Sequence, residues 1–202
     1  MTQESSDIRI NVTEQGKVLA DLLAQTRVFY RQAGLMIGAA DQLMQRNGWD
    51  RVRPGYASVP KDARISHNWM PEDLFHFYKR EDGRGGLLRP FYCVIVHNID
   101  EPHLVGEPLA STGWIEFETS NAMEGCGDEA AHAHIWADSR RDDGQFIISL
   151  SKPSWPAWAQ GVRAATTMAL PLVTINTDDD METKLIKPML IGLENAMRKA
   201  GA

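Results

Sequence analysis

Two histidines that lie two residues apart form the clearest set of potential metal ligands in the chain. They are His132 and His134, in a segment that also holds acidic residues and a cysteine. If residues 131–137 form a strand, its period of two places both imidazoles on one face, where each can offer a neutral nitrogen to a metal ion. A third ligand could come from the residues just before them: Glu129, Asp128 or Cys126. One hypothesis is therefore a metal-dependent hydrolytic enzyme, and the alternative is that both histidines are only hydrated beside an acidic loop.

Other catalytic arrangements have less support. Cys126 is surrounded by Glu124, Asp128 and Glu129, and these negative charges disfavour the thiolate that a nucleophilic cysteine requires. The chain contains no G-x-S-x-G, no G-x-x-x-x-G-K-[ST] and no G-x-G-x-x-G. The sequence therefore indicates neither a serine hydrolase nor a glycine-rich nucleotide loop, and we expect no cofactor.

Tryptophan is abundant, with six residues in the chain. Because tryptophan is enriched in binding pockets and protein interfaces, several of these side chains are candidates for a small-molecule pocket or a partner surface. Trp114 should face outward, together with Glu116, if its neighbour Ile115 faces the core. In the alternative interpretation, the tryptophans cover the edges of the core. The candidates are Trp114, Trp136, Trp155 and Trp158.

A long helix is predicted over residues 14–48. Its apolar residues recur at heptad positions a and d, with further apolar residues at e, which gives a stripe wider than a coiled-coil seam. Gly48 is expected as the left-handed residue that ends the helix, with Trp49 folding back onto the last turn. The a and d positions are Leu19, Leu22, Thr26, Phe29, Ala33, Met36, Ala40 and Leu43, and the e positions are Leu23, Tyr30, Ile37 and Met44.

The middle of this helix, residues 33–40, is apolar on nearly every side. Gly34 and Gly38 lie four residues apart, which permits another backbone to approach closely, although each glycine weakens the helix by about 1 kcal/mol relative to alanine. We expect a second layer of the fold to cover this segment. The alternative is a homodimer contact through the two glycines, since symmetric dimers are common.

The remaining pattern indicates one α+β domain over residues 1–202, with an antiparallel sheet of about 4–6 strands flanked by a long N-terminal and a C-terminal helix. A hairpin with a long loop is expected between residues 91–96 and 109–118, and Pro171 should confine the strand 168–175 to an edge or a bulge. Thr177 or Asp178 should begin the last helix, which Pro188 must kink or split. The predicted parts are an arm or edge strand (1–13), the long helix (14–48), a short helix (71–80), the sheet region (88–175) and the C-terminal helix (178–199).

Composition sets the broad class. The chain has 202 residues, 43% of them hydrophobic, a formal net charge of -6 and a pI near 5.5. A globular cytoplasmic protein is expected, because the N-terminus resembles no secretory signal and no apolar stretch approaches the ~20 residues of a membrane span. The acidic balance argues against nucleic-acid binding, and two cysteines do not make a disulfide framework.

The leading functional hypothesis is a non-enzymatic domain that binds a partner or a small ligand, in the manner of a sensor or scaffold. The expected partner is a second copy of the chain or another protein, without nucleic acid or membrane. This hypothesis rests on the middle of the long helix, which is apolar on nearly every side, and on the abundance of tryptophan. The alternative is the metal-dependent hydrolase that would use His132 and His134.

Overall fold

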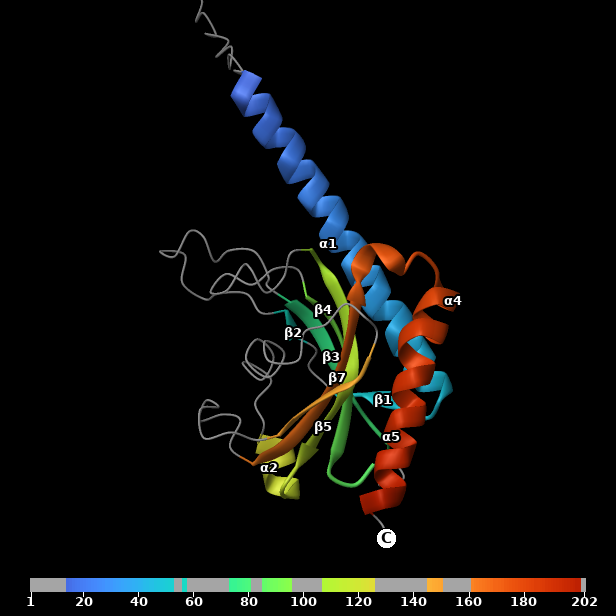
Figure 1. Ribbon diagram of the computed structural model, residues 1–202. Coiled ribbons are helices and arrows are strands. Elements are labelled where there is room, and N and C mark those ends of the chain that lie inside the picture. The colour runs from blue at the N-terminus through green and yellow to red at the C-terminus, as the bar shows by residue number, and fades with distance from the viewer. Residues whose placement is uncertain are drawn as a thin grey trace, which may run out of the picture. The chain divides into compact units, whose positions relative to one another are not determined.

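The computed structural model describes residues 14–52, 56–57, 73–80, 85–95, 107–125, 145–150 and 161–200. Within the chain, residues 1–35 and residues 36–202 form two compact units. The organisation of residues 1–202 as one domain stays a prediction. The α+β class is confirmed, since an antiparallel sheet is accompanied by a long N-terminal helix and a C-terminal helix (Figure 1).

The sheet has the strand order β1-β3-β4-β5-β7-β6, and β2 also pairs with β3. Every pairing between neighbouring strands is antiparallel. The hairpin between β4 and β5 confirms the predicted one, with Phe91 opposite Gly113 and Cys93 opposite Ser111. The strands are β1 (Asp50–Arg51), β2 (Tyr56–Ala57), β3 (Asp73–Lys79), β4 (Leu88–Ile95), β5 (Leu109–Phe117), β6 (Ile147–Leu150) and β7 (Val162–Pro171).

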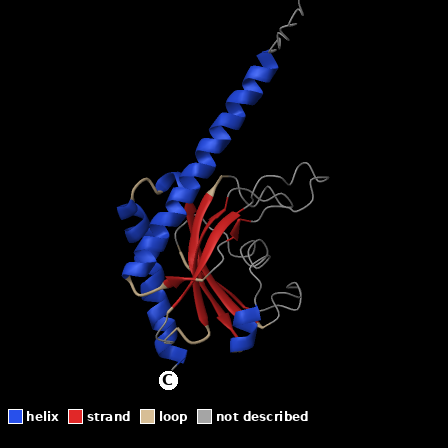
Figure 2. Ribbon diagram, turned by 180° about the vertical axis from the view of Figure 1, so that it is seen from behind, coloured by secondary structure: helices blue, strands red, loops and turns tan. Residues whose placement is uncertain are grey.

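The two faces of the sheet carry different side chains. One face holds a continuous apolar cluster built from alternate residues of four strands, as the period of two requires. The other face lies under residues 36–46 and under the C-terminal helical segment 178–200, and Figure 2 shows these two segments on the same side of the strands. The buried members of the apolar cluster are Phe75, Phe77, Phe91, Cys93, Ile95, Leu109, Ile115, Phe117, Val162, Ala165 and Ala169.

Helix α1 (Glu14–Arg46) ends as the sequence predicts. Gly48 has a φ of 78°, its N–H donates to the carbonyl of Gln45, and the N–H of Trp49 donates to the carbonyl of Met44, both at 3.0 Å. This pair of bonds is the Schellman motif, which only a left-handed residue such as glycine accommodates without strain. It seats Trp49, which is 2% exposed, against the last turn.

The C-terminal helix is split near Pro188, in agreement with the prediction. It consists of α4 (Asp178–Met181), a π-helical segment η5 (Glu182–Ile186) and α5 (Lys187–Ala200). Proline has no N–H to give to the carbonyl four residues earlier, and the chain widens into the π-helical turn just before it. Its buried residues include Met181, Leu185, Met189 and Leu193.

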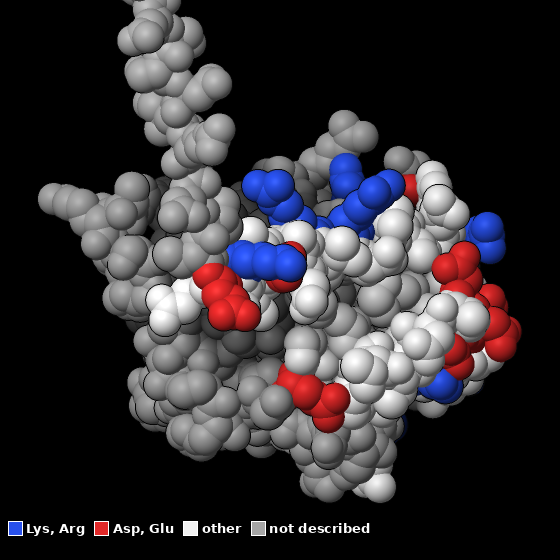
Figure 3. Space-filling model, turned by 90° about the horizontal axis from the view of Figure 1, so that it is seen from above, with Lys and Arg blue, Asp and Glu red and all other residues white. Residues whose placement is uncertain are grey.

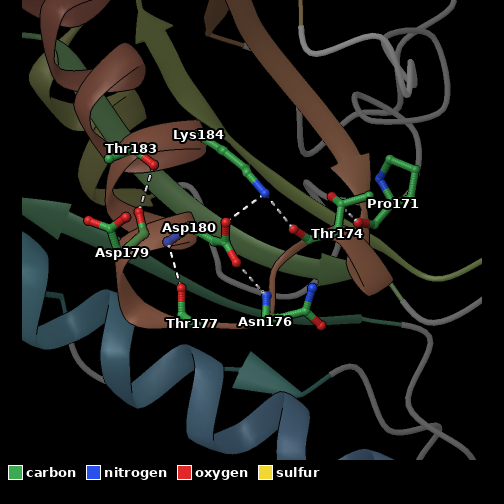
Figure 4. A network of polar contacts seen from close by, with 8 residues as sticks. All are labelled: Pro171, Thr174, Asn176, Thr177, Asp179, Asp180, Thr183 and Lys184. Atoms are coloured by element: carbon green, nitrogen blue, oxygen red, sulfur yellow. Dashed lines mark hydrogen bonds and ion pairs between the residues drawn. The ribbon is translucent and has the colours of Figure 1, made fainter.

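A polar network holds the start of this helix (Figure 4). The hydroxyl of Thr177 accepts a hydrogen bond from the N–H of Asp180 at 3.0 Å, which confirms Thr177 as the N-cap. Lys184 pairs with the carboxylate of Asp180 and also donates to the carbonyl of Thr174 at 2.8 Å. The Lys184 bond lowers the pKa of Asp180.

The acidic residues of α4 gather on one part of the surface, at the right of the view in Figure 3. Three consecutive aspartates, Asp178 to Asp180, occupy the first turn. Their negative charges favour the positive end of the helix dipole. Figure 4 shows that Asp180 bonds to Thr177 and Lys184, so this residue of the cluster stabilises the start of the helix.

Two predicted elements are wrong. In place of the helix predicted at 71–80, residues 73–79 form strand β3, in which Phe75 and Phe77 face the apolar cluster while His76 lies on the opposite face. The alternation of aromatic residues favours a strand, and it outweighs the acidic and basic residues that resemble helix ends.

The strand predicted at 168–175 instead spans residues 162–171 and lies inside the sheet, between β5 and β6. Pro171 is its last residue, so the missing N–H costs no internal ladder bond. The 3-10 turn η4 (Leu172–Thr174) follows it directly. The remaining described helix is the short α2 (Ser120–Gly125).

Candidate functional site

Among the described residues, those of the first unit contain the largest group of exposed apolar side chains on one helix face. In α1, Leu19 is 58% exposed, Leu22 55% and Leu23 41%, and Val18 beside them is 56% exposed. At about 100° per residue, the three leucines lie within an arc of roughly 100°. We call these four residues the leucine stripe. A contiguous apolar patch of this kind is typical of an interaction surface.

The opposite side of the same helix provides a comparison. Val28 and Leu35 are 59% and 61% exposed, but each lies about 160–180° around the helix from Leu19. They are separated from each other by almost two turns. These two residues are isolated exposed hydrophobics, which are normal on protein surfaces.

Residues 36–46 of α1 belong to the second unit and pack on the sheet. Ile37, Ala40, Leu43 and Met44 are buried there. Among them, Asp41 accepts a hydrogen bond from the hydroxyl of Tyr78 at 3.0 Å, and its Oδ1 lies 2.8 Å from Nδ1 of His76. Its other oxygen is 3.4 Å from Nη1 of Arg51. One carboxylate therefore joins α1 to β3 and β1.

Two tyrosines lie on the sheet face beneath these helices. Burial raises the pKa of Tyr78 well above its usual value, and the nearby charge of Asp41 adds to the shift. Burial also raises the pKa of Tyr92, whose hydroxyl has no hydrogen-bond partner among the described residues. Both phenols are therefore neutral and uncharged at physiological pH. The cluster therefore contains an Asp–His pair, Asp41 and His76, beside a neutral phenol, Tyr78.

A cleft of about 820 Å³ lies between the last turns of α5 and the ends of strands β4, β5 and β7. Its position follows from a β-bulge: Glu116 pairs with Ala164 and Phe117 with Val162, so Arg163 has no partner in the ladder. Bulges of this kind redirect a side chain, and Arg163 here contacts Glu116 at 3.2 Å. The lining residues include Glu116, Glu118, Arg163, Met197 and Lys199.

Trp114 lies on the helix-covered face of β5. Its ring is 8% exposed, contacts α5 at Gly192 and lies 5.5 Å from the ring of Phe146. The expectation that it faces outward to solvent is wrong, because α5 covers it. This position agrees with a role in the core.

Gly34 and Gly38, the predicted close-contact glycines, have open space beside them. A Cβ atom at either position would meet no atom within 4 Å in the described part of the chain. Leu35 between them is exposed. The second layer expected over the whole segment 33–40 is therefore only partial, and the homodimer contact stays a prediction.

The remaining predicted site residues lie outside the described residues. These are the metal-ligand candidates and three of the tryptophans: His132, His134, Glu129, Asp128, Cys126, Trp136, Trp155 and Trp158. Within the described ranges, no group of three or more His, Cys, Asp or Glu side chains could hold a metal ion. None of the helices in those ranges combines the length and the apolar character that crossing a membrane requires.

Two groups of residues were not anticipated. Asp41 had a signal in the sequence, because it is a charged residue between the apolar positions Ala40 and Leu43. His76 was concealed by the wrong helix prediction. The cleft residues Glu118, Arg163 and Lys199 gave no signal, since single charged residues far apart in the sequence are ordinary surface residues.

Comparison with known proteins yields no relationship: no family model, no curated protein and no solved structure matches this chain.

Proposed function

We propose that this protein is a partner-binding protein, and that the leucine stripe of α1 pairs two copies of the chain. The observation that carries the proposal is the exposure of Leu19, Leu22 and Leu23 on one side of a helix. Most of the stability of a helix in a protein comes from the packing of its apolar face rather than from helix propensity. Within the described part of the chain these side chains stay exposed, and a second copy would cover them.

A second copy suits the stripe because its sequence is self-complementary. The a, d, e and g positions from Val18 to Gln32 carry no charged side chain, so two copies can face each other without bringing like charges together. The stripe is also wider than an a/d seam, which favours a broad helix–helix contact. Two-fold pairing of identical surfaces is the commonest symmetry among soluble homo-oligomers.

The energetics predict reversible pairing. Burying the exposed half of each of four aliphatic side chains contributes roughly 1 kcal/mol per side chain, or roughly 8 kcal/mol for two copies. The loss of translational and rotational freedom on association costs about 4–15 kcal/mol. Because the two quantities are of the same order, the dimer should form only as the concentration rises into the micromolar range or above.

Sedimentation equilibrium between about 1 µM and 500 µM tests the proposal. The wild-type protein should shift from monomer to dimer over this range. The variant Leu19→Gln/Leu22→Gln should remain monomeric, because two polar side chains then replace the leucines at the centre of the stripe. The matched control is Val28→Gln/Leu35→Gln, which alters two equally exposed residues on the other side of the helix and should dimerise like wild type.

A wild-type protein that stays monomeric over the whole range would contradict the proposal. So would a control variant that dissociates as readily as the stripe variant, because the pairing would then reflect general hydrophobicity. Circular dichroism of both variants establishes that the helix is retained.

A further inference from the structure

The cleft beside α5 combines apolar walls with charges of both signs. Leu88 and Phe117 are buried residues on its floor, and Ala196 and Met197 line it from α5. Its volume of about 820 Å³ is within the range of small-molecule sites. Methionine is well suited to such a wall, because its flexible side chain adapts to different apolar groups.

The charges in the cleft divide into a matched pair and two unmatched groups. Arg163 and Glu116 form an ion pair at 3.2 Å. Glu118 and Lys199 line the same cleft, yet neither forms an ion pair with the other or with any other described residue. One carboxylate and one ammonium group therefore lie apart in the same cavity, each without a described counter-charge.

From this arrangement we propose that the cleft binds a small zwitterion with an aliphatic side chain, that is, an α-amino acid of the leucine type. The ammonium group of the ligand pairs with Glu118, and its carboxylate pairs with Lys199, assisted by the guanidinium donors of Arg163 that Glu116 does not use. The side chain packs against Met197 and the apolar floor. The site is independent of the leucine stripe, so this inference does not depend on the pairing of two copies.

Isothermal titration calorimetry with three probes tests the inference. L-leucine should bind with a saturable signal by about 10 mM. N-acetyl-L-leucine lacks the ammonium group and L-leucinamide lacks the carboxylate, so each should bind about tenfold more weakly. No saturable binding of L-leucine, or equal binding of all three compounds, would overturn the proposal.

Two substitutions assign the ends of the ligand. Glu118→Gln should weaken L-leucine about tenfold and leave N-acetyl-L-leucine unchanged, whereas Lys199→Gln should weaken L-leucine and leave L-leucinamide unchanged. Lys199→Arg should restore binding. Lys187→Gln, an exposed lysine outside the cleft, is the matched control and should bind as wild type does. A loss of similar size in this control would show that the effect is not local, and sedimentation of the same variants separates this failure from a failure of pairing.

Discussion

Oδ1 of Asp41 lies 2.8 Å from Nδ1 of His76, and it also accepts a hydrogen bond from the hydroxyl of Tyr78 at 3.0 Å. Asp41 is on α1, whereas the other two residues are on β3, more than thirty positions later in the chain. Both partners lie on the sheet face under the helices, because they are alternate residues of one strand. A single carboxylate therefore satisfies two polar side chains and fixes the end of α1 on the sheet.

Replacing this carboxylate should destabilise the fold. Asp41→Ala leaves the buried hydroxyl of Tyr78 without its acceptor, and the free energy of unfolding should fall by about 1–3 kcal/mol, as measured by urea denaturation. Asp21→Ala is the control, since Asp21 is exposed on the same helix and undergoes the same gain in helix propensity. If Asp41→Ala does not fold, Tyr78→Phe removes one of the two bonds alone. Equal stability of the two aspartate variants would contradict the role assigned to Asp41.

The buried tyrosines predict a loss of stability in alkali. Burial raises the pKa of Tyr92 above its usual value of 10.0, so above pH 10 the unfolded chain releases a proton that the folded protein retains. The stabilising contribution is therefore complete below pH 10 and decreases above it, by about 1.4 kcal/mol per pH unit for each such tyrosine. Between pH 8 and pH 11, the urea midpoint should therefore fall further in the wild-type protein than in Tyr92→Phe.

The same variant tests the environment of the Tyr92 hydroxyl. Because this group has no hydrogen-bond partner among the described residues, Tyr92→Phe should be neutral or slightly stabilising at pH 8. If the urea midpoints of the wild type and of Tyr92→Phe fall equally between pH 8 and pH 11, groups other than Tyr92 cause the loss of stability in alkali. A large loss of stability at pH 8 would indicate that the hydroxyl is bonded.

The sequence was most informative where a local motif determines the structure. Gly48 ends α1 and Thr177 begins α4, because each position depends on a few neighbouring backbone groups. The pairing of β4 with β5 could be predicted for a similar reason, since both strands are long and strongly apolar. Strand β3 is harder to predict, because Pro71, Glu72 and Lys79 are residue types typical of helix ends, whereas the aromatic alternation between them favours a strand.

The candidate sites depend on long-range packing, which one sequence does not specify. Whether Leu19 and Leu22 are exposed depends on whether another part of the molecule packs against them. An apolar stripe in the sequence does not distinguish a buried helix from an exposed one. The cleft requires that the bulge at Arg163 and the end of α5 come together, more than thirty residues apart. Sequence periodicity predicts the elements but not this juxtaposition.

The metal hypothesis remains a separate prediction. If His132 and His134 hold a metal ion, a native mass spectrum of untagged protein should contain one stoichiometric transition metal that the variant His132→Ala/His134→Ala lacks. The proposed partner-binding function instead expects identical metal content in both proteins. Stoichiometric metal lost from the variant would favour the hydrolase, and hydrolytic substrates would then be screened.

Substitution by alanine should lower the stability of the protein at Gly113 and raise it at Gly34 and Gly38. At Gly113, a Cβ atom would lie 1.9 Å from the carbonyl oxygen of Thr166 on the neighbouring strand. Because that oxygen belongs to the backbone in the centre of the sheet, Gly113→Ala should destabilise the fold by several kcal/mol or prevent folding. Gly34→Ala and Gly38→Ala meet open space, and each should stabilise α1 by up to about 1 kcal/mol.

The two helix glycines also discriminate between models of the dimer. If the pairing is confined to the leucine stripe, Gly34→Ala and Gly38→Ala should leave the dissociation constant unchanged while raising the thermal midpoint. If the backbones of two copies approach closely at these glycines, the added methyl groups would separate the helices and weaken the dimer. Sedimentation equilibrium of the double variant therefore locates the contact along α1, and a weakened dimer would move it from Leu22 toward the glycines.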